Sequence, residues 1–208
     1  ANNEQECLNA LARIKPILSH LKNAVERESV LVESYIYGEE VAFEGLLHKG
    51  SLKQLAIFDK PDLMEGPFFE ETYYVGPSRL SYDAQQLIFD RVESACEAYG
   101  LREGPIHAEL RLADKEAFII EIASRTIGGD CADMVKFGLN IGLEELVLLQ
   151  AMGKPVDIPV LKYSIGVLMI PIPSQGILRR VEGINDAKNN EYIMDVGISV
   201  REGYELVP

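Results

Sequence analysis

Residues 107–125 read HAELRLADKEAFIIEIASR, and this stretch decides how the chain folds. Apolar and polar residues alternate on both sides of a short polar turn, which predicts antiparallel strands at 106–112 and 117–122. A hairpin centred on Lys115 pairs positions that are symmetric about it, so we expect Glu109 and Glu121 to face each other. Their Cβ atoms are then expected roughly 5 Å apart on one face of the sheet.

Two carboxylates that face each other repel and need a compensating cation. A hard, oxygen-seeking ion such as Mg²⁺ or Mn²⁺ fits them and leaves coordination positions for phosphate oxygens. Strand alternation places His107, Arg111 and Arg125 on the same face. A solvated hairpin face is the competing explanation, because charged faces are common on open antiparallel sheets. The adjacent Gly128 and Gly129 favour a site, since glycines let a backbone approach a ligand closely.

The segments before this hairpin predict helices and strands. Residues 7–25 have helical spacing of leucine and isoleucine, and Pro16 is expected to kink or break that helix. Val30 and Val32 predict the beginning of a strand that Gly38 interrupts.

The middle and the tail of the chain complete the predicted elements. Strands at 41–45 and 52–58 are expected to form a hairpin. Residues 60–77 are rich in proline, glycine and aromatic residues, which predicts a long loop of the kind that often serves as a functional lid. An amphipathic helix follows at 81–99, with Ser81 as its N-cap and Gly100 at its C-terminal stop. Leucine-rich helices are expected next, and then short strands around one brief helix.

Composition excludes several classes of protein. The chain has 208 residues, of which 47% are hydrophobic, which is typical of a globular protein. Its formal net charge of −13 repels phosphate backbones and argues against general binding of DNA or RNA. No apolar run is long enough to span a membrane and no signal peptide is visible. Three widely spaced cysteines predict reduced thiols and a cytoplasmic protein.

The segments VLVESYIYGEEVAFEGLL, GPIHAELRL and AFIIEIASRTIGGD, in this order, resemble the ATP-grasp superfamily. The resemblance is closest to L-amino-acid ligases and related carboxylate–amine ligases. It implies an α+β fold: residues 1–158 as the C-terminal lobe of an ATP-grasp domain, an antiparallel sheet flanked by helices, and residues 159–208 as a small β-rich domain. The chain is then expected to be a C-terminal fragment, inactive alone, without the lysine-bearing N-terminal lobe.

The resemblance also implies where ATP binds. Glu33, Tyr35 and Ile36 correspond to the hinge that meets the adenine edge. Glu40, in a G-x-E pattern, corresponds to the acid that meets the ribose hydroxyls.

The same resemblance assigns roles around the 107–125 hairpin. Glu109 and Glu121 match the two Mg²⁺ ligands, and Arg125 matches the arginine that stabilises the transferred phosphoryl group. Gly128 and Gly129 match the contacts with the carboxylate substrate, and the resemblance implies that Lys60 and the aromatic loop after it line the same substrate pocket. One departure is Ala123, which stands where many members of the superfamily have asparagine.

The implied reaction activates a carboxylate as an acyl-phosphate at the expense of ATP and joins it to an amine. Such a reaction needs positioning and charge neutralisation rather than a protein nucleophile. The expected partners are therefore ATP, Mg²⁺ or Mn²⁺, and small carboxylate and amine substrates, with a homodimer left open. A biotin-carboxylase-like enzyme and a non-catalytic interaction or dimerisation module of the same fold are the alternatives.

Overall fold

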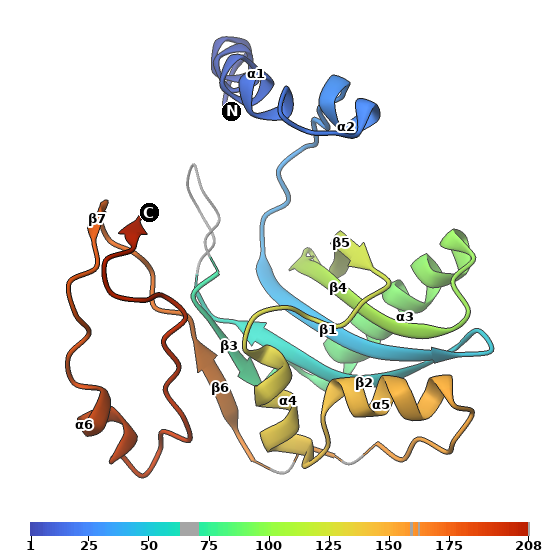
Figure 1. Ribbon diagram of the computed structural model, residues 1–208. Helices are drawn as coiled ribbons and strands as arrows, with labels where there is room; N and C mark the ends of the chain where they lie inside the picture. Colours follow the sequence, from blue (N-terminus) through green and yellow to red (C-terminus); the bar gives the residue numbers. More distant parts are fainter. Residues whose placement is uncertain (63–70, 159, 162, 208) are drawn as a thin grey trace. The chain divides into compact units, whose positions relative to one another are not determined.

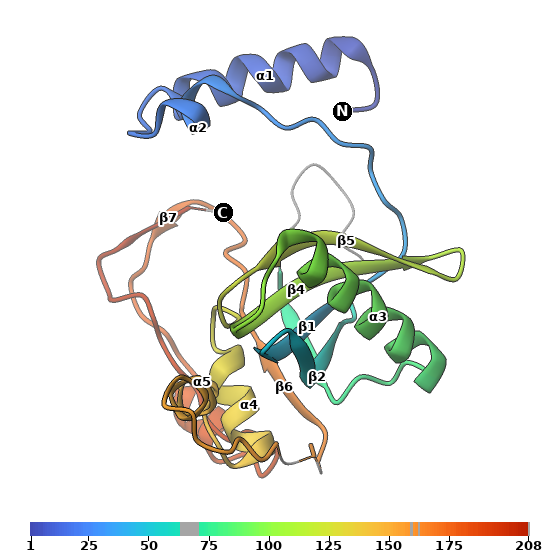
Figure 2. The same ribbon diagram turned by 90° about the vertical axis from the view of Figure 1, so that its right-hand side faces the viewer.

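The structure is a computed structural model that describes residues 1–62, 71–158, 160–161 and 163–207. The chain divides into two compact units, Ala1–Ile36 and Tyr37–Pro208. Within the described residues no helix is long and apolar enough to cross a membrane. Figures 1 and 2 show the two units from two sides.

The first unit holds two helices, α1 (Glu4–Leu18) and α2 (Ala24–Glu28). Asparagine side chains accept hydrogen bonds from backbone N–H groups at both N-termini, which satisfies donors that a helix leaves unpaired there. Helix α1 ends two residues after Pro16, in agreement with the predicted break. The strand expected from Val30 is absent, because Val30 and Val32 are exposed and extended without a strand partner in the described chain.

The second unit is built on a six-stranded antiparallel sheet in the order β5-β4-β1-β2-β3-β6. Figure 1 shows the long β1–β2 hairpin at its centre. The strands are β1 (Glu39–His48), β2 (Ser51–Lys60), β3 (Tyr73–Gly76), β4 (Gly104–Ala113), β5 (Glu116–Ala123) and β6 (Ile165–Leu168). This sheet and its helices confirm the predicted α+β class.

Helices cover both faces of the sheet. Helix α3 (Tyr82–Tyr99) lies against one face, and α4 (Cys131–Leu139) and α5 (Leu143–Ala151) cover the other, as Figure 2 shows. Alternate residues of the central strands therefore enter two separate apolar clusters. Phe43 and Ile57 face α3, whereas Ala42 and Phe58 face α4 and α5.

The predicted hairpin and the pairing of Glu109 with Glu121 are confirmed, but the register shifts by one residue between Glu109 and Leu110, so the pairs nearer the turn are not centred on Lys115. Glu109 pairs with Glu121 across β4 and β5, and the turn residues Asp114 and Lys115 both have positive φ. Gly38 precedes β1 at φ 121°, and a Cβ atom there would lie 2.0 Å from the carbonyl oxygen of Leu112. Only glycine lets the chain enter the sheet so close to β4.

Helix α3 confirms the expected caps. The side chain of Ser81 accepts a hydrogen bond from the backbone N–H of Ala84 at 3.3 Å. Gly100 ends the helix in the left-handed conformation.

The predicted loop at 60–77 is partly a strand, because β3 occupies Tyr73–Gly76 and pairs with β2 and β6. Sequence patterns missed this strand because only four residues contribute to it. Residues 63–70 of the predicted loop lie outside the described residues.

The C-terminal segment contributes to the main sheet. Strand β6 belongs to residues 159–208, yet it pairs with β3. Beyond it, β7 (Gly176–Ile177) and β8 (Glu205–Leu206) pair with each other, and α6 (Ile184–Lys188) lies between them in the chain. The predicted boundary between residues 158 and 159 stays a prediction.

Candidate functional site

The register of the three central strands gathers charged side chains at one end of the α4 and α5 face. Glu40, the second residue of β1, pairs with Lys60 on β2 and with Arg111 on β4. Two positions along, Ala42 pairs with Glu109. The small alanine side chain leaves room beside the longer side chains of its neighbours. All of these residues lie on one face because strand side chains alternate.

The ammonium group of Lys60 is the centre of this cluster. Its Nζ atom donates hydrogen bonds to Glu40 Oε1 at 2.9 Å, Glu71 Oε1 at 2.6 Å and Glu109 Oε1 at 2.8 Å. The Lys60 side chain is only 4% exposed, and its Nζ lies 5.2 Å from the centre of the Tyr74 ring. Three carboxylates from three parts of the chain thus converge on one buried cation.

Arg111 completes the cluster from the other side. Its Nε donates to Glu40 Oε2 at 2.7 Å, so both oxygens of the buried Glu40 carboxylate face a cation. Buried charges are tolerated when each is paired and hydrogen-bonded in this way.

The pairings shift the pKa values of the cluster. Burial alone would lower the pKa of Lys60, but the hydrogen bonds that its ammonium group donates to Glu109, Glu71 and Glu40 outweigh burial and raise that pKa above the ordinary value. Burial would raise the pKa of Glu109, yet His107 and Lys60 lower it to about 2. Burial, and then the neighbouring Glu71, raise the pKa of the Tyr74 hydroxyl. Lys60 and Glu109 are therefore both charged at neutral pH.

A second buried pair lies beside the cluster. His107 Nδ1 is 2.5 Å from Glu44 Oε1, and His107 Nε2 is 3.7 Å from Glu109 Oε1. Burial would lower the pKa of His107, but Glu109 and Glu44 raise it to about 9. Burial also raises the pKa of Glu44, and the contact with His107 only partly offsets this. Because the pKa values of both His107 and Glu44 are raised, the pair holds its shared proton tightly.

Glu121 and Arg125 lie outside the buried cluster. They form an ion pair at 3.4 Å, and each side chain is 55% exposed. The guanidinium group of Arg125 also donates to the backbone carbonyl of Thr126 at 3.0 Å. The structure thus brings Glu121 opposite Glu109, as predicted, but on the solvent side of the pair.

The remaining predicted residues have different surroundings. Gly128 and Gly129 are exposed in the loop between β5 and α4, and Gly129 has a φ of 62°. Glu33, Tyr35 and Ile36 belong to the first unit, in an extended segment outside any helix or strand. Their assignment to an adenine site stays a prediction.

Sequence reasoning missed two acidic residues of this region. Glu71 lies just before β3, and only the pairing of β3 with β2 brings it to Lys60. Glu44 is separated from His107 by 63 positions, and the β1–β4 register joins them. The alternation of Glu40 and Glu44 on one strand face is the signal that could have pointed to Glu44.

The donor set of the cluster fits a divalent metal ion. Carboxylate oxygens of Glu40, Glu71 and Glu109 lie within 4.8 Å of one another. An all-oxygen set of carboxylates is the preference of Mg²⁺ and Mn²⁺ rather than of softer metals. Lys60 already shows that these oxygens accommodate a cation at their centre.

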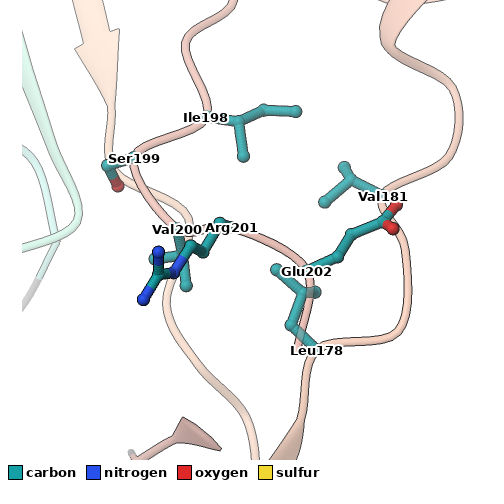
Figure 3. A pocket seen from close by; sticks show the side chains of 7 residues that line it. All are labelled: Leu178, Val181, Ile198, Ser199, Val200, Arg201 and Glu202. Carbon is teal, nitrogen blue, oxygen red and sulfur yellow. The ribbon is translucent and has the colours of Figure 1, made fainter. Parts of the chain in front are cut away.

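A hollow in the C-terminal segment is chemically different. It measures about 380 Å³ and is lined by both apolar and polar side chains between Leu178 and Glu202. Figure 3 shows that the charged ends of Arg201 and Glu202 point in opposite directions. Without converging polar groups among its lining residues, this hollow has no arrangement for catalysis.

Comparisons with known proteins agree with the geometry. A family model described as "ATP-grasp domain" matches residues 1–134. Over 125 residues the chain is 30% identical to an alanine–anticapsin ligase of Bacillus subtilis and to one of Bacillus amyloliquefaciens. These matches cover 59% of this chain and 26% of each relative.

Among solved structures, the chain is similar to an L-amino acid ligase from Bacillus licheniformis. The two share 27% identity with a TM-score of 0.89, over 100% of this chain and 53% of the ligase. Phosphoribosylglycinamide synthetase from Anaerococcus prevotii has the same fold at 17% identity and a TM-score of 0.67, over 82% of this chain and 44% of that one. The chain thus spans about a quarter of the curated relatives and about half of the solved ligase.

Proposed function

The chain belongs to the ATP-grasp family, and on this premise we propose that the protein is an ATP-dependent carboxylate–amine ligase. In this proposal it activates a small carboxylate, of amino-acid type, as an acyl-phosphate and joins it to an amine. The observation that carries the proposal is the cluster in which the Glu40, Glu71 and Glu109 carboxylates surround Lys60. The resemblance to amino acid ligases indicates the substrate class.

The acidic residues are proposed to hold Mg²⁺ or Mn²⁺ together with the phosphates of ATP. Glu109 and Glu121 face each other in the hairpin register, and Glu71 adds a third carboxylate on the side of Lys60. When bound, a divalent ion neutralises phosphate charge and orients the transferred group. Glu40 is proposed to meet the ribose hydroxyls, with Glu33, Tyr35 and Ile36 at the adenine.

The cationic residues supply the remaining charge stabilisation. Lys60 keeps its proton because its pKa is raised, so it stays available as a cation next to a developing negative charge. The exposed guanidinium group of Arg125 is proposed to meet the transferred phosphoryl group, at the beginning of the loop with Gly128 and Gly129. The backbone at these two glycines is proposed to contact the carboxylate substrate, since no side chain shields it.

No residue of this cluster has to act as a nucleophile. The carboxylate of the substrate attacks the γ-phosphoryl group of ATP, ADP leaves, and the amine then displaces phosphate from the acyl-phosphate. The protein positions the groups and neutralises charge, which is the main source of catalysis in phosphoryl transfer.

A panel of amino acids, assayed pairwise for ADP release with Mg²⁺, tests this proposal in a protein that also carries the N-terminal lobe, because this chain alone is expected to be inactive. We expect ADP release that requires both a carboxylate and an amine, and a Glu109→Gln variant that loses it. Glu116→Gln, at the exposed first residue of β5 in the same hairpin, is the matched control and should keep the wild-type rate. ADP release that depends on bicarbonate and biotin instead, or none in the whole panel, would refute the proposal.

Metal binding provides an independent test. Mn²⁺ titration of the protein, followed by electron paramagnetic resonance, should give weaker binding for Glu109→Gln and Glu121→Gln than for the wild type. Identical Mn²⁺ binding curves for the wild type and Glu121→Gln would favour the alternative, a non-catalytic interaction or dimerisation module with the same fold.

A further inference from the structure

Glu44 is a fully buried carboxylate that the proposed chemistry does not use. It lies in the middle of β1 and is 0% exposed. A buried charge is expensive unless it is paired, and an apolar pair of similar volume is often at least as stable. Its neighbours on the same sheet face, Ala42 and Leu46, belong to the apolar cluster. The contacts of Glu44 are therefore where a reason for its presence should be sought.

Both oxygens of Glu44 are engaged, and they reach two different elements. Oε1 accepts a hydrogen bond from His107 on β4 at 2.5 Å. Oε2 accepts a hydrogen bond from the backbone N–H of Ile127 at 3.2 Å, across 83 positions of sequence. Ile127 is itself buried, so its N–H group has little access to solvent.

Each of the two partners leads to a residue of the proposed site. His107 lies against Glu109 with its second ring nitrogen, 3.7 Å from the same oxygen that accepts from Lys60. Ile127 lies between Arg125 and Gly128, in a loop that has no helix or strand of its own. Glu44 thus connects the carboxylate cluster with the loop through two contacts.

We infer that Glu44 is a positioning residue that fixes the loop of residues 125–129 relative to Glu109. The inference rests on the proposed function, because that function makes Glu109 a metal ligand and assigns the contacts with the carboxylate substrate to Gly128 and Gly129 in the loop. The hydrogen bonds of Glu44 go to His107 and to the Ile127 N–H group, so it acts through these two groups. Loss of the Glu44 carboxylate should therefore weaken binding of the carboxylate substrate more than binding of ATP.

Amide hydrogen exchange tests the connection without any need for activity. Glu44→Leu keeps the volume but removes both acceptors, and we expect exchange at the Ile127 amide to accelerate by about tenfold or more. Glu44→Gln retains an acceptor oxygen for this amide, so exchange there should stay within about threefold of the wild type. Ile88→Val, in the cluster under α3, is the control and should leave the Ile127 amide protected.

The outcomes separate this inference from the proposed function. Unchanged protection of Ile127 in folded Glu44→Leu would overturn the inference. If that variant does not fold, folded His107→Gln decides, because it removes the imidazole that holds Oε1 of Glu44 while Oε2 still faces the Ile127 N–H group. Faster exchange at Ile127 then supports the inference, and unchanged exchange overturns it.

Steady-state kinetics of the ligase reaction, measured for wild type and variants in a protein that also carries the N-terminal lobe, adds a second readout. Glu44→Leu should raise KM for the carboxylate by about tenfold and leave KM for ATP within about twofold, with Glu44→Gln in between. A larger rise in KM for ATP than for the carboxylate would contradict the inference. Absence of turnover in the wild type would instead refute the proposed function, and the exchange result would still decide the role of Glu44.

Discussion

The two faces of the main sheet differ in the side chains that they bury and therefore in what they contribute to the protein. On the α3 side, β1, β2 and β4 contribute apolar side chains such as Val41, Ile57 and Ala108 to the cluster around Ile88 and Val92. On the α4 and α5 side, the same strands present Phe58 and Ala42 and then, at one end, Lys60 and its carboxylates. One face stabilises the fold by excluding water, and the other keeps charges buried at a cost that stability alone does not explain.

The largest effect is expected where the charged face loses its central cation. Lys60→Met leaves the carboxylates of Glu40, Glu71 and Glu109 close together without an ammonium group. We expect the free energy of unfolding to fall by about 3–5 kcal/mol, the loss typical of breaking a buried ion pair. Urea unfolding followed by circular dichroism measures it.

Added Mn²⁺ sharpens this prediction, because a metal ion that binds the folded state stabilises it by mass action. Mn²⁺ should stabilise Lys60→Met more than the wild type, in which the ammonium competes for the same oxygens. Lys53→Met, at an exposed position of β2, is the control and should change little in either condition. An equal gain from Mn²⁺ in all three proteins would argue against a shared cation position.

The next effect is a pH dependence that only the charged face should produce. Folded His107 holds its proton up to a pKa of about 9, whereas an unfolded histidine has an ordinary pKa near 6.5. Between these values the folded state binds more protons, so the free energy of unfolding should fall as the pH rises from 6.5 to 9. Urea midpoints at intervals across this range measure the decline.

Replacing each histidine separately identifies the origin of the decline. His107→Gln should flatten the profile between pH 6.5 and 9. His48→Gln removes a histidine whose contact with Glu103 is exposed on both sides, and it should keep the wild-type slope. A slope that persists in His107→Gln would assign the effect to other groups.

A smaller effect distinguishes the two carboxylates of the hairpin. Glu109 accepts from Lys60 in the buried cluster, whereas Glu121 pairs with Arg125 at the surface. Glu109→Gln should lower the free energy of unfolding by about 1–3 kcal/mol, and Glu121→Gln by no more than about 0.5 kcal/mol. Thermal unfolding at pH 7 without metal measures both. Equal losses would mean that burial does not separate their roles.

The same comparison explains what could be predicted from the sequence. Alternation and turn residues are local, so they predicted the register of Glu109 with Glu121 and the strands on either side of it. The resemblance added the family and its reaction, and the family match confirms the family. Caps of helix α3 were predictable for the same local reason, because Ser81 and Gly100 act within one turn.

Non-local pairing accounts for what the sequence did not reveal. Glu71 and Glu44 reach their partners only through strands paired across distant parts of the chain. The strand predicted from Val30 was wrong because β-branched residues favour a strand only when a partner strand is present. Whether Glu121 and Arg125 act in catalysis stays a prediction, since their exposed pair is equally typical of a surface.

The smallest effect is expected on the apolar face. Ile88→Val removes one methylene group from a fully buried side chain of α3. It should lower the free energy of unfolding by about 0.5–1.5 kcal/mol and leave Mn²⁺ affinity unchanged, because the α3 cluster and the Lys60 cluster lie on opposite sides of the sheet. Urea unfolding and Mn²⁺ titration of the same preparation measure the two quantities. If Ile88→Val instead binds Mn²⁺ clearly more weakly than the wild type, the two faces are coupled through the strands. The division between a stabilising face and a charged face would then have to be abandoned.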